Sequence, residues 1–403
     1  MTGTSFERYV DHTWDKVFEG ATVHSSVFII KNGFNNDNNI LVDNDFELEQ
    51  NRLDVTSWSF ERPEVLDLRD KINANSSFIK DISGLGFYRG LLSGYNDAFV
   101  IDGKVRNELI KKDPKSKDVI KSLLRGRDIK KWEINYKDLY ILYIPWRFPI
   151  DEYISIKDHL SKFKSNLEKR PEVKAGRVDW FALSRYASDY YAEFEKEKLI
   201  YPNIAPKLFV AFDDSGFYTN QKCYIITSDT INLKYLGVLL SSKTLNFIFK
   251  FLGSTLEGKR FDLNKKYVER LPIKLIEDIK QKPYIEKADK MLFLNKGLVA
   301  EINGFKDWLQ RSPYNLDKFS QKLDKYYKLP FEEFLTELNK KKVDTKPRKV
   351  QELLKTEFEE SINKINPLLQ QIKETDNEID QIVYDLYGLT TEEIKIIEGN
   401  LDG

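Results

Sequence analysis

The chain has 403 residues, of which 41% are hydrophobic and 32% charged, so it can bury the cores of two or three domains. Its single cysteine, Cys223, excludes an internal disulfide and a cysteine-rich zinc site, and its three scattered histidines suggest no metal site. Lys plus Arg and Asp plus Glu number 64 each, so net charge indicates no particular partner, and without a signal peptide or a membrane-length apolar run we expect a cytoplasmic protein.

The first part of the chain predicts short strands, turns and one helix. Residues 23–30 are rich in β-branched side chains and predict a strand. Residues 32–39, NGFNNDNN, predict a polar linker, and residues 63–72 predict a short helix with proline at its start. A strand as apolar as residues 23–30 needs a sheet to pair with.

Residues 83–102 place four glycines around Arg89 and two tyrosines. The segment is not a phosphate-binding loop of the Walker type and lacks the spacing of a dinucleotide-binding loop. Two interpretations remain, namely tight turns between short strands or a backbone surface that lies against DNA phosphates. A helix over residues 107–122 is predicted to follow.

The most distinctive segment is residues 123–132, LLRGRDIKKW. It lies in a basic stretch, since residues 104–137 contain 12 basic and 5 acidic residues, whereas residues 351–403 contain 4 basic and 13 acidic residues. Its cations are Arg125, Arg127, Lys130 and Lys131, and Trp132 is expected to add a stacking face. The segment predicts a contact with a polyanion, and the alternative is a solvated basic turn before a strand.

Basic and aromatic side chains recur in the loops downstream. Residues 150–170 predict an amphipathic helix, residues 200–227 a hairpin around the turn 213–216, and residues 235–251 a buried helix. The loop residues that could contact phosphates or bases are Lys174, Arg177, Arg185, Asn220, Lys259 and Arg260, together with Arg89. This alternation of strands and helices predicts an α+β fold.

The last third predicts two long helices, over residues 285–309 and 350–386, from apolar side chains at helical spacing. We expect the helices to pack as a pair. Their alternative role is a spacer or a docking surface for another domain or subunit.

Several catalytic motifs are missing from the sequence. It contains no GxSxG, HExxH or CxxC, and no adjacent prolines, so the NPPY or DPPY motif that holds a flipped adenine is absent. We therefore assign no catalytic, cofactor-binding or metal-binding residue to this chain.

Six blocks of the sequence, in order, resemble the TaqI-like C-terminal specificity domain, the target-recognition part of type IIG restriction-modification enzymes and N6-adenine DNA methyltransferases. The match spans about residues 40–273, and the blocks read YRGLLSGYNDAFVID, LLRGRDIKKW, IDEYISIKDHLSKFKSNLEKR, IYPNIAPKLFVAFDDSGFYTNQKCYIIT, YLGVLLSSKTLNFIFKF and KKYVERLPI. The segment VFEGATVHSSVFIIK resembles the final strands of the methyltransferase sheet in the same enzymes, and EIDQIVYDLYGLTTEEIKIIE resembles the way many of them end.

The resemblance implies three parts. They are a remnant of the last strands of a methyltransferase sheet in residues 1–34, a mixed α/β DNA target-recognition domain in residues 40–275, and a long-helix C-terminal region in residues 276–403. S-adenosylmethionine would belong to the missing methyltransferase domain.

The resemblance also implies a function and partners. The chain is expected to recognise a double-stranded DNA sequence for a site-specific adenine-N6 methyltransferase or type IIG enzyme and to work with a methyltransferase catalytic domain or subunit. The alternative is a helical interaction subunit that docks a separate catalytic methyltransferase or nuclease partner and binds little DNA itself.

Overall fold

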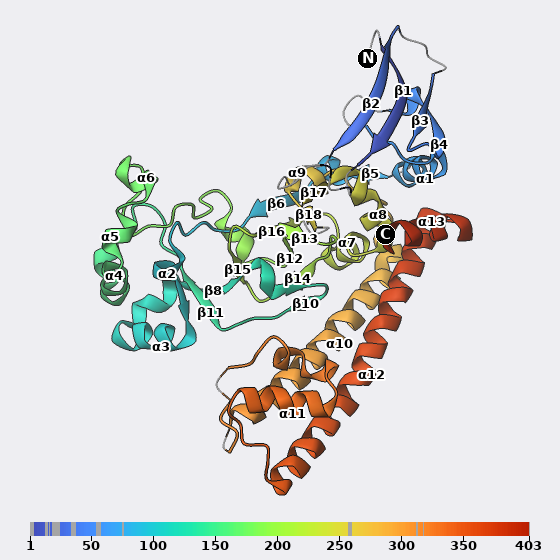
Figure 1. Ribbon diagram of the computed structural model, residues 1–403. Coiled ribbons are helices and arrows are strands. Elements are labelled where there is room, and N and C mark those ends of the chain that lie inside the picture. Colours follow the sequence, from blue (N-terminus) through green and yellow to red (C-terminus); the bar gives the residue numbers. More distant parts are fainter. Residues whose placement is uncertain are drawn as a thin grey trace.

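The computed structural model describes residues 4–12, 15, 17, 25–33, 38–53, 58–74, 76–256, 260–311, 313–316 and 318–402. It has the predicted α+β class, with small sheets in the first two thirds of the chain and long helices in the last third. Figure 1 shows three lobes around a central body, formed by strands β1–β4, by helices α2–α6 and by helices α10–α12. No helix among the residues described is long and apolar enough to span a bilayer.

The N-terminal lobe is a four-stranded sheet in the order β2-β1-β3-β4, with helix α1 packed against it. Its elements are β1 (Thr4–Asp11), β2 (Ser26–Asn32), β3 (Asn39–Val42), β4 (Phe46–Glu49) and α1 (Pro63–Asn73). Phe6, Ile40 and Leu48 of the sheet bury their side chains against Leu66 of α1. The helix confirms the prediction, and β2 confirms the predicted strand over its described residues, since positions 23 and 24 lie outside them. Positions 34–37 of the predicted linker lie outside the described residues, and β2 and β3 on either side of it belong to one sheet.

The central body contains two four-stranded sheets, β14-β12-β16-β6 and β15-β8-β11-β7, one three-stranded sheet, β13-β18-β17, and the pairs β10-β9 and β19-β5. The strands are β5 (Ser77–Phe78), β6 (Leu85–Arg89), β7 (Val100–Asp102), β8 (Ile120–Leu124), β9 (Ile129–Lys130), β10 (Glu133–Ile134), β11 (Leu139–Leu142), β12 (Lys198–Pro202), β13 (Ile204–Ala205), β14 (Ala211–Asp213), β15 (Tyr218–Thr219), β16 (Cys223–Ser228), β17 (Ser254–Leu256), β18 (Arg260–Asp262) and β19 (Pro272–Ile273). The helices of this part are α2 (Asn96–Phe99), α3 (Gly103–Lys112), α4 (Ile154–Ser161), α5 (Lys164–Leu167), α6 (Pro171–Lys174), α7 (Leu233–Leu240), α8 (Lys243–Leu252) and α9 (Lys265–Val268).

The predicted hairpin around residues 213–216 is wrong, because β14 and β15 belong to different sheets. Asp213 at the end of β14 forms a fully buried ion pair with Lys198 of β12, with 2.6 Å between Nζ and Oδ2. The same carboxylate accepts hydrogen bonds from the backbone N–H groups of Ser215 and Phe217. These bonds turn the chain away from β14, and β15 then pairs in parallel with β8.

Three predicted helices are broken in the structure. The helix predicted over residues 107–122 stops before Pro114, which starts a 3-10 turn and is followed by β8. The helix predicted over residues 150–170 divides into short pieces that include α4 and α5. The buried helix predicted over residues 235–251 is two helices, because the side chain of Ser242 caps the start of α8.

The last third forms the predicted pair of long helices. The elements are α10 (Asp278–Gln310), α11 (Phe331–Lys340), α12 (Arg348–Tyr387) and α13 (Thr391–Asp402). Helices α10 and α12 run side by side (Figure 1), and their far halves enclose a core with α11 that includes Phe305, Phe334 and Phe358.

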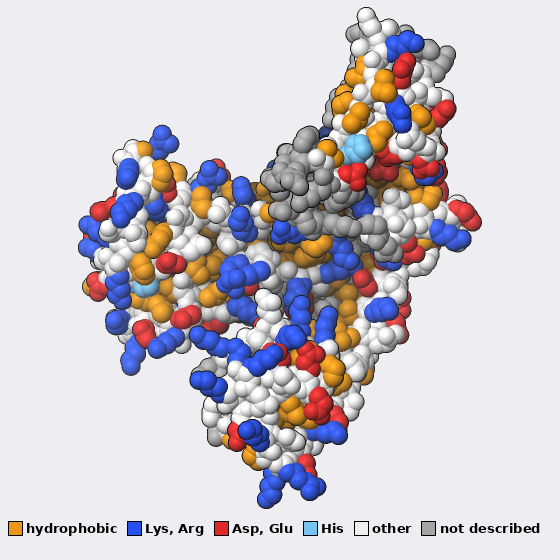
Figure 2. Space-filling view, viewed as in Figure 1, with side chains coloured by type: hydrophobic (Ala, Val, Ile, Leu, Met, Phe, Trp, Pro, Cys, Tyr) orange, Lys and Arg blue, Asp and Glu red, His pale blue; other side chains and the backbone are white. Residues whose placement is uncertain are grey.

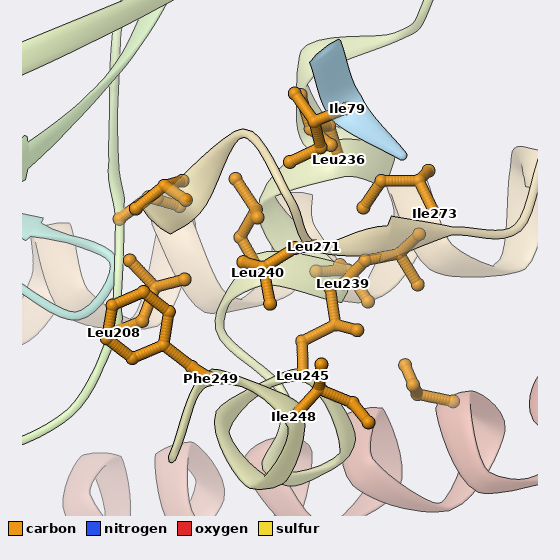
Figure 3. Packing of buried hydrophobic residues seen from close by; sticks show 14 of the residues in the cluster. Ile79, Leu208, Leu236, Leu239, Leu240, Leu245, Ile248, Phe249, Leu271 and Ile273 are labelled. Atoms are coloured by element: carbon orange, nitrogen blue, oxygen red, sulfur yellow. The ribbon is translucent and has the colours of Figure 1, made fainter. Parts of the chain in front are cut away.

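The near ends of α10 and α12 are docked on the central body. Figure 3 shows the core there, in which Leu236, Leu239 and Leu240 of α7 meet side chains of α8 and of the segment that leads to β19. The hydroxyl of Tyr387, the last residue of α12, donates a hydrogen bond of 2.7 Å to the carbonyl oxygen of Pro272. The helical lobe is thus fixed to the central body by apolar packing and by specific hydrogen bonds.

Candidate nucleic-acid interface

The first arginine of the LLRGRDIKKW segment is bound within the fold. Arg125 precedes the 3-10 turn η4 (Gly126–Asp128), and the carboxylate of Asp128 accepts hydrogen bonds of 2.9 Å each from Nε, from Nη2 and from the backbone N–H of Arg125. The Asp128 side chain is only 3% exposed. Such a two-pronged charged pair is among the strongest in proteins, so Arg125 serves to hold this turn closed.

The two lysines of the segment also have protein partners. Lys130 Nζ lies 2.5 Å from Glu133 Oε1, and Lys131 Nζ lies 2.5 Å from Asp376 Oδ1 of α12. Trp132 is only 2% exposed and packs close to α7, so the expectation that it offers a stacking face is wrong. Burial of this large aromatic ring in the core stabilises the fold more than its exposure on a loop would.

The hairpin of β9 and β10 faces the helical lobe. The pKa of Lys137, just after β10, is lowered, first by burial and then by the nearby charge of Lys306 on α10. The pKa of Tyr327, in the 3-10 turn η7 (Leu323–Lys328), is raised by burial and by Glu133 of β10. Lys131 of the LLRGRDIKKW segment and the residues that follow the segment, Glu133 and Lys137, therefore lie against the helical lobe.

Arg127 differs from the other cations of this segment. It is exposed and has no ion-pair or hydrogen-bond partner for its side chain among the residues that the structure describes. It lies in η4, and η4 packs against the turn at residues 220–222, since a Cβ atom on Gly126 would lie 3.0 Å from the carbonyl oxygen of Lys222. This contact brings two basic loops together.

A third segment meets the turn at residues 220–222. Arg89 ends β6, and its Nε donates a hydrogen bond of 3.2 Å to the carbonyl oxygen of Gln221. The next residue, Gly90, must be a glycine, because a Cβ atom there would lie 2.0 Å from the carbonyl oxygen of Asn220. The guanidinium group of Arg89 also lies 5.9 Å from the ring centre of Tyr224.

A fourth segment, which contains Arg185, lies next to Arg89 and the turn at residues 220–222. Its backbone exchanges two hydrogen bonds with Leu92, just beyond β6. Burial raises the pKa of Tyr190, and the positive charges of Arg185 and Arg89 oppose that increase. The Tyr190 hydroxyl donates a hydrogen bond of 3.0 Å to the carbonyl oxygen of Arg89.

We call this surface the basic edge, and it consists of Arg89, Arg127, Arg185, Asn220 and Lys222. The residues come from four separate segments of the sequence, yet they meet where β6, β8 and β16 reach one end of the central body. Asn220 Oδ1 accepts a hydrogen bond of 3.1 Å from the backbone N–H of Lys222, which shapes the turn. Figure 2 shows Lys and Arg side chains gathered across the middle of the visible face, between the three lobes.

Lys222 was not among the predicted residues, although it lies two residues from Asn220 and directly before a strand. The available signal was the polar run TNQK, residues 219–222, directly before the apolar run CYIIT. No ion pair involves Lys222 among the described ranges of the chain. Its ammonium group is thus free to bind an anion.

The remaining predicted residues lie elsewhere. Lys174 and Arg177 are exposed at and after α6, at the outer tip of the α2–α6 lobe and away from β6 (Figure 1). Arg260 is exposed at the start of β18, whose partner β13 follows β12. Lys259 lies outside the described residues. The structure therefore brings Arg89, Arg127, Arg185 and Asn220 together and leaves Lys174 and Arg177 apart.

The titratable groups offer no metal site within the part of the chain that the structure describes, where no cluster of three or more His, Cys, Asp or Glu side chains could hold an ion. Cys223 is buried, and burial raises the pKa of its thiol. His159 is buried with Nε2 lying 3.0 Å from the carbonyl oxygen of Ala98, and burial lowers its pKa. Both residues belong to the core.

Two protein-family models match parts of the chain. Residues 121–273 match the model of the TaqI-like C-terminal specificity domain, and residues 277–383 match a domain of unknown function (DUF8810). The first match confirms the resemblance found in the sequence. Among solved structures, the chain is similar to the type IIL restriction-modification enzyme MmeI in complex with DNA, with 14% identity and a TM-score of 0.41 over 93% of this chain and 46% of that one. The chain thus spans less than half of that enzyme.

Proposed function

We propose that this chain, whose residues 121–273 belong to the TaqI-like C-terminal specificity domains, recognises a DNA sequence for a site-specific adenine-N6 DNA methyltransferase or type IIG restriction-modification enzyme. The observation that carries the proposal is the basic edge. It collects three arginines and a lysine around one turn of this domain, although the whole chain has no net charge. Such local concentration of cations is how proteins attract and position a DNA duplex.

The side chains of the basic edge have distinct uses toward DNA. Arg127 and Lys222 are exposed and unpaired in the described structure, so we assign them to phosphate contacts. Arg89 and Arg185 present planar forks, which can bind O6 and N7 of guanine together. Oδ1 of Asn220 already accepts a hydrogen bond within the turn, from the backbone N–H of Lys222. The side-chain NH2 group of Asn220 can donate to a base or a phosphate.

The exposure of strand β2 is evidence for a neighbouring catalytic domain that covers it. Val27, Phe28, Ile29 and Ile30 are between 45% and 54% exposed, and β2 is an edge strand of its sheet. An apolar edge of this kind invites pairing with another strand. We propose that a methyltransferase sheet covers it and that this methyltransferase domain, rather than the present chain, binds S-adenosylmethionine and carries out catalysis.

The interaction-subunit alternative has one observation in its favour. Ile279 and Phe293 of α10 are each 76% exposed, and their spacing of about four helical turns puts them on the same side of the helix. In this alternative the helical lobe docks a catalytic partner and the basic edge binds DNA weakly.

The two functions differ in their response to salt. If the basic edge neutralises several phosphates, affinity for a duplex falls by roughly tenfold or more between about 50 and 200 mM salt, and Lys222→Ala reduces the slope of log affinity against log salt by about 0.9. The matched control is Lys349→Ala, which removes an exposed, unpaired lysine at the far end of α12. Equilibrium titration of a labelled duplex measures both. A salt-insensitive affinity, or equal slopes for wild type and Lys222→Ala, would support the interaction-subunit alternative.

A further inference from the structure

Four aromatic rings form a continuous row beside the basic edge. The ring centres of Trp146 and Tyr186 lie 5.4 Å apart, those of Tyr186 and Tyr143 lie 6.5 Å apart, and those of Tyr143 and Tyr191 lie 6.4 Å apart. The two ends of the row are open to solvent, since Trp146 is 43% and Tyr191 is 52% exposed. Large rings gain free energy from burial, so a row with both ends exposed offers surface to a partner.

Hydrogen bonds fix the orientation of two rings of the row. Trp146 donates a hydrogen bond of 2.8 Å from Nε1 to the carbonyl oxygen of Leu183, and Tyr143 donates one of 3.0 Å from its hydroxyl to the carbonyl oxygen of Tyr186. A ring whose orientation is already fixed loses little conformational entropy when it binds.

The two loops that carry the row contain strained backbone. Arg147, directly after Trp146, has φ of 58°, and Ala187, directly after Tyr186, has φ of 60°. Residues other than glycine adopt this left-handed conformation at an energetic cost, and such residues are concentrated at binding and catalytic sites.

The row runs into the basic edge. Tyr191 follows Tyr190, whose hydroxyl is bound to the backbone of Arg89, and Tyr186 follows Arg185 of the basic edge. Arg147 is exposed beside Trp146. The exposed rings are therefore flanked by cations, as in proteins that bind unpaired nucleic acid, where aromatic rings stack on bases and cations follow the backbone.

We propose that the row of Trp146, Tyr186, Tyr143 and Tyr191 is a stacking platform for DNA bases that are unpaired or unstacked at the bound site. The inference rests on the proposed function and deepens it, because it adds contacts to base faces to those that the basic edge makes with phosphates and base edges. Stacking depends on the flat face that every base has, so the platform favours opened DNA over a particular sequence.

The test compares the full chain on an intact duplex and on the same duplex with a short single-stranded gap, by fluorescence anisotropy at low salt. The wild type should prefer the gapped duplex by roughly fivefold to a hundredfold. Trp146→Leu and Tyr191→Leu should lose this preference and keep their affinity for the intact duplex. Trp146→Phe and Tyr191→Phe keep an aromatic ring at these positions and should retain most of the preference for the gapped duplex.

Phe293→Leu is the matched control, because it removes an exposed ring from α10, outside the row. Equal melting temperatures of the Leu variants and the wild type would exclude misfolding as the cause of a loss, and the Phe variants provide the same check independently. If the wild type binds the intact duplex with no preference for the gap, or if the Leu variants keep the preference, the inference is overturned and the proposed function stands. If the wild type binds neither DNA, the proposed function fails as well.

Discussion

Arg125 and Arg127 lie two residues apart, and the structure predicts opposite effects for their removal. Arg125→Ala deletes two charged hydrogen bonds to Asp128, whose side chain is only 3% exposed, and leaves that carboxylate with the backbone N–H alone. A buried ion that loses its partner costs about 3–5 kcal/mol, but Arg125 is itself 23% exposed, so water can partly replace it. We expect Arg125→Ala to lower the free energy of unfolding by about 1–3 kcal/mol.

Arg127→Ala removes an exposed side chain without a partner among the described residues, so the free energy of unfolding should change by less than about 0.5 kcal/mol. Its effect should appear in DNA binding instead, as a salt slope smaller by about 0.9. Urea denaturation and duplex titration of both variants separate the two roles. The reasoning is refuted if Arg125→Ala is as stable as the wild type, or if Arg127→Ala binds DNA with an unchanged slope.

Three further predictions concern the core. Asp213→Asn leaves Lys198 buried without its counter-charge and should cost about 3–5 kcal/mol in urea denaturation. Lys198→Met with Asp213→Asn removes the buried charge and keeps an acceptor for the turn, so it should cost less than Asp213→Asn alone; equal losses would contradict this. Because burial lowers the pKa of His159, the unfolded chain binds the proton more tightly, so stability should fall as the pH drops below about 6.5, and His159→Gln should reduce that fall. Cys223 is buried with a raised thiol pKa, so a thiol reagent should modify it only as fast as the protein unfolds, and rapid modification of the native chain would show that the site is open.

Local patterns predicted the long elements well. The pair α10 and α12 follows from apolar side chains repeated over many helical turns, and helix α1 follows from a proline at its first position. Shorter elements depended on contacts that are distant in sequence. Asp213 ends β14 because it pairs with Lys198, and no local pattern reveals that contact.

The candidate site shows the same division. The sequence indicated basic and amide side chains as candidates, and the structure brings Arg89, Arg127, Arg185 and Asn220 to one place. The sequence alone could not show which cations already form ion pairs within the protein. Lys131 pairs with Asp376 of α12, and that partner lies 245 positions away. The local charge excess therefore pointed in part to cations that the fold itself uses, Arg125 and Lys130 in local ion pairs and Lys131 in a contact with the helical lobe.

Selection from a pool of random duplexes tests the central claim most directly. The purified full chain is mixed with the pool at low and at moderate salt, and bound DNA is recovered and sequenced over several rounds. We expect salt-sensitive recovery and enrichment of one sequence by the wild type. The double variant Arg89→Ala, Arg185→Ala should lose that enrichment, and Lys349→Ala should keep it. Recovery that is insensitive to salt and enriches no sequence would contradict a role for this chain in reading DNA.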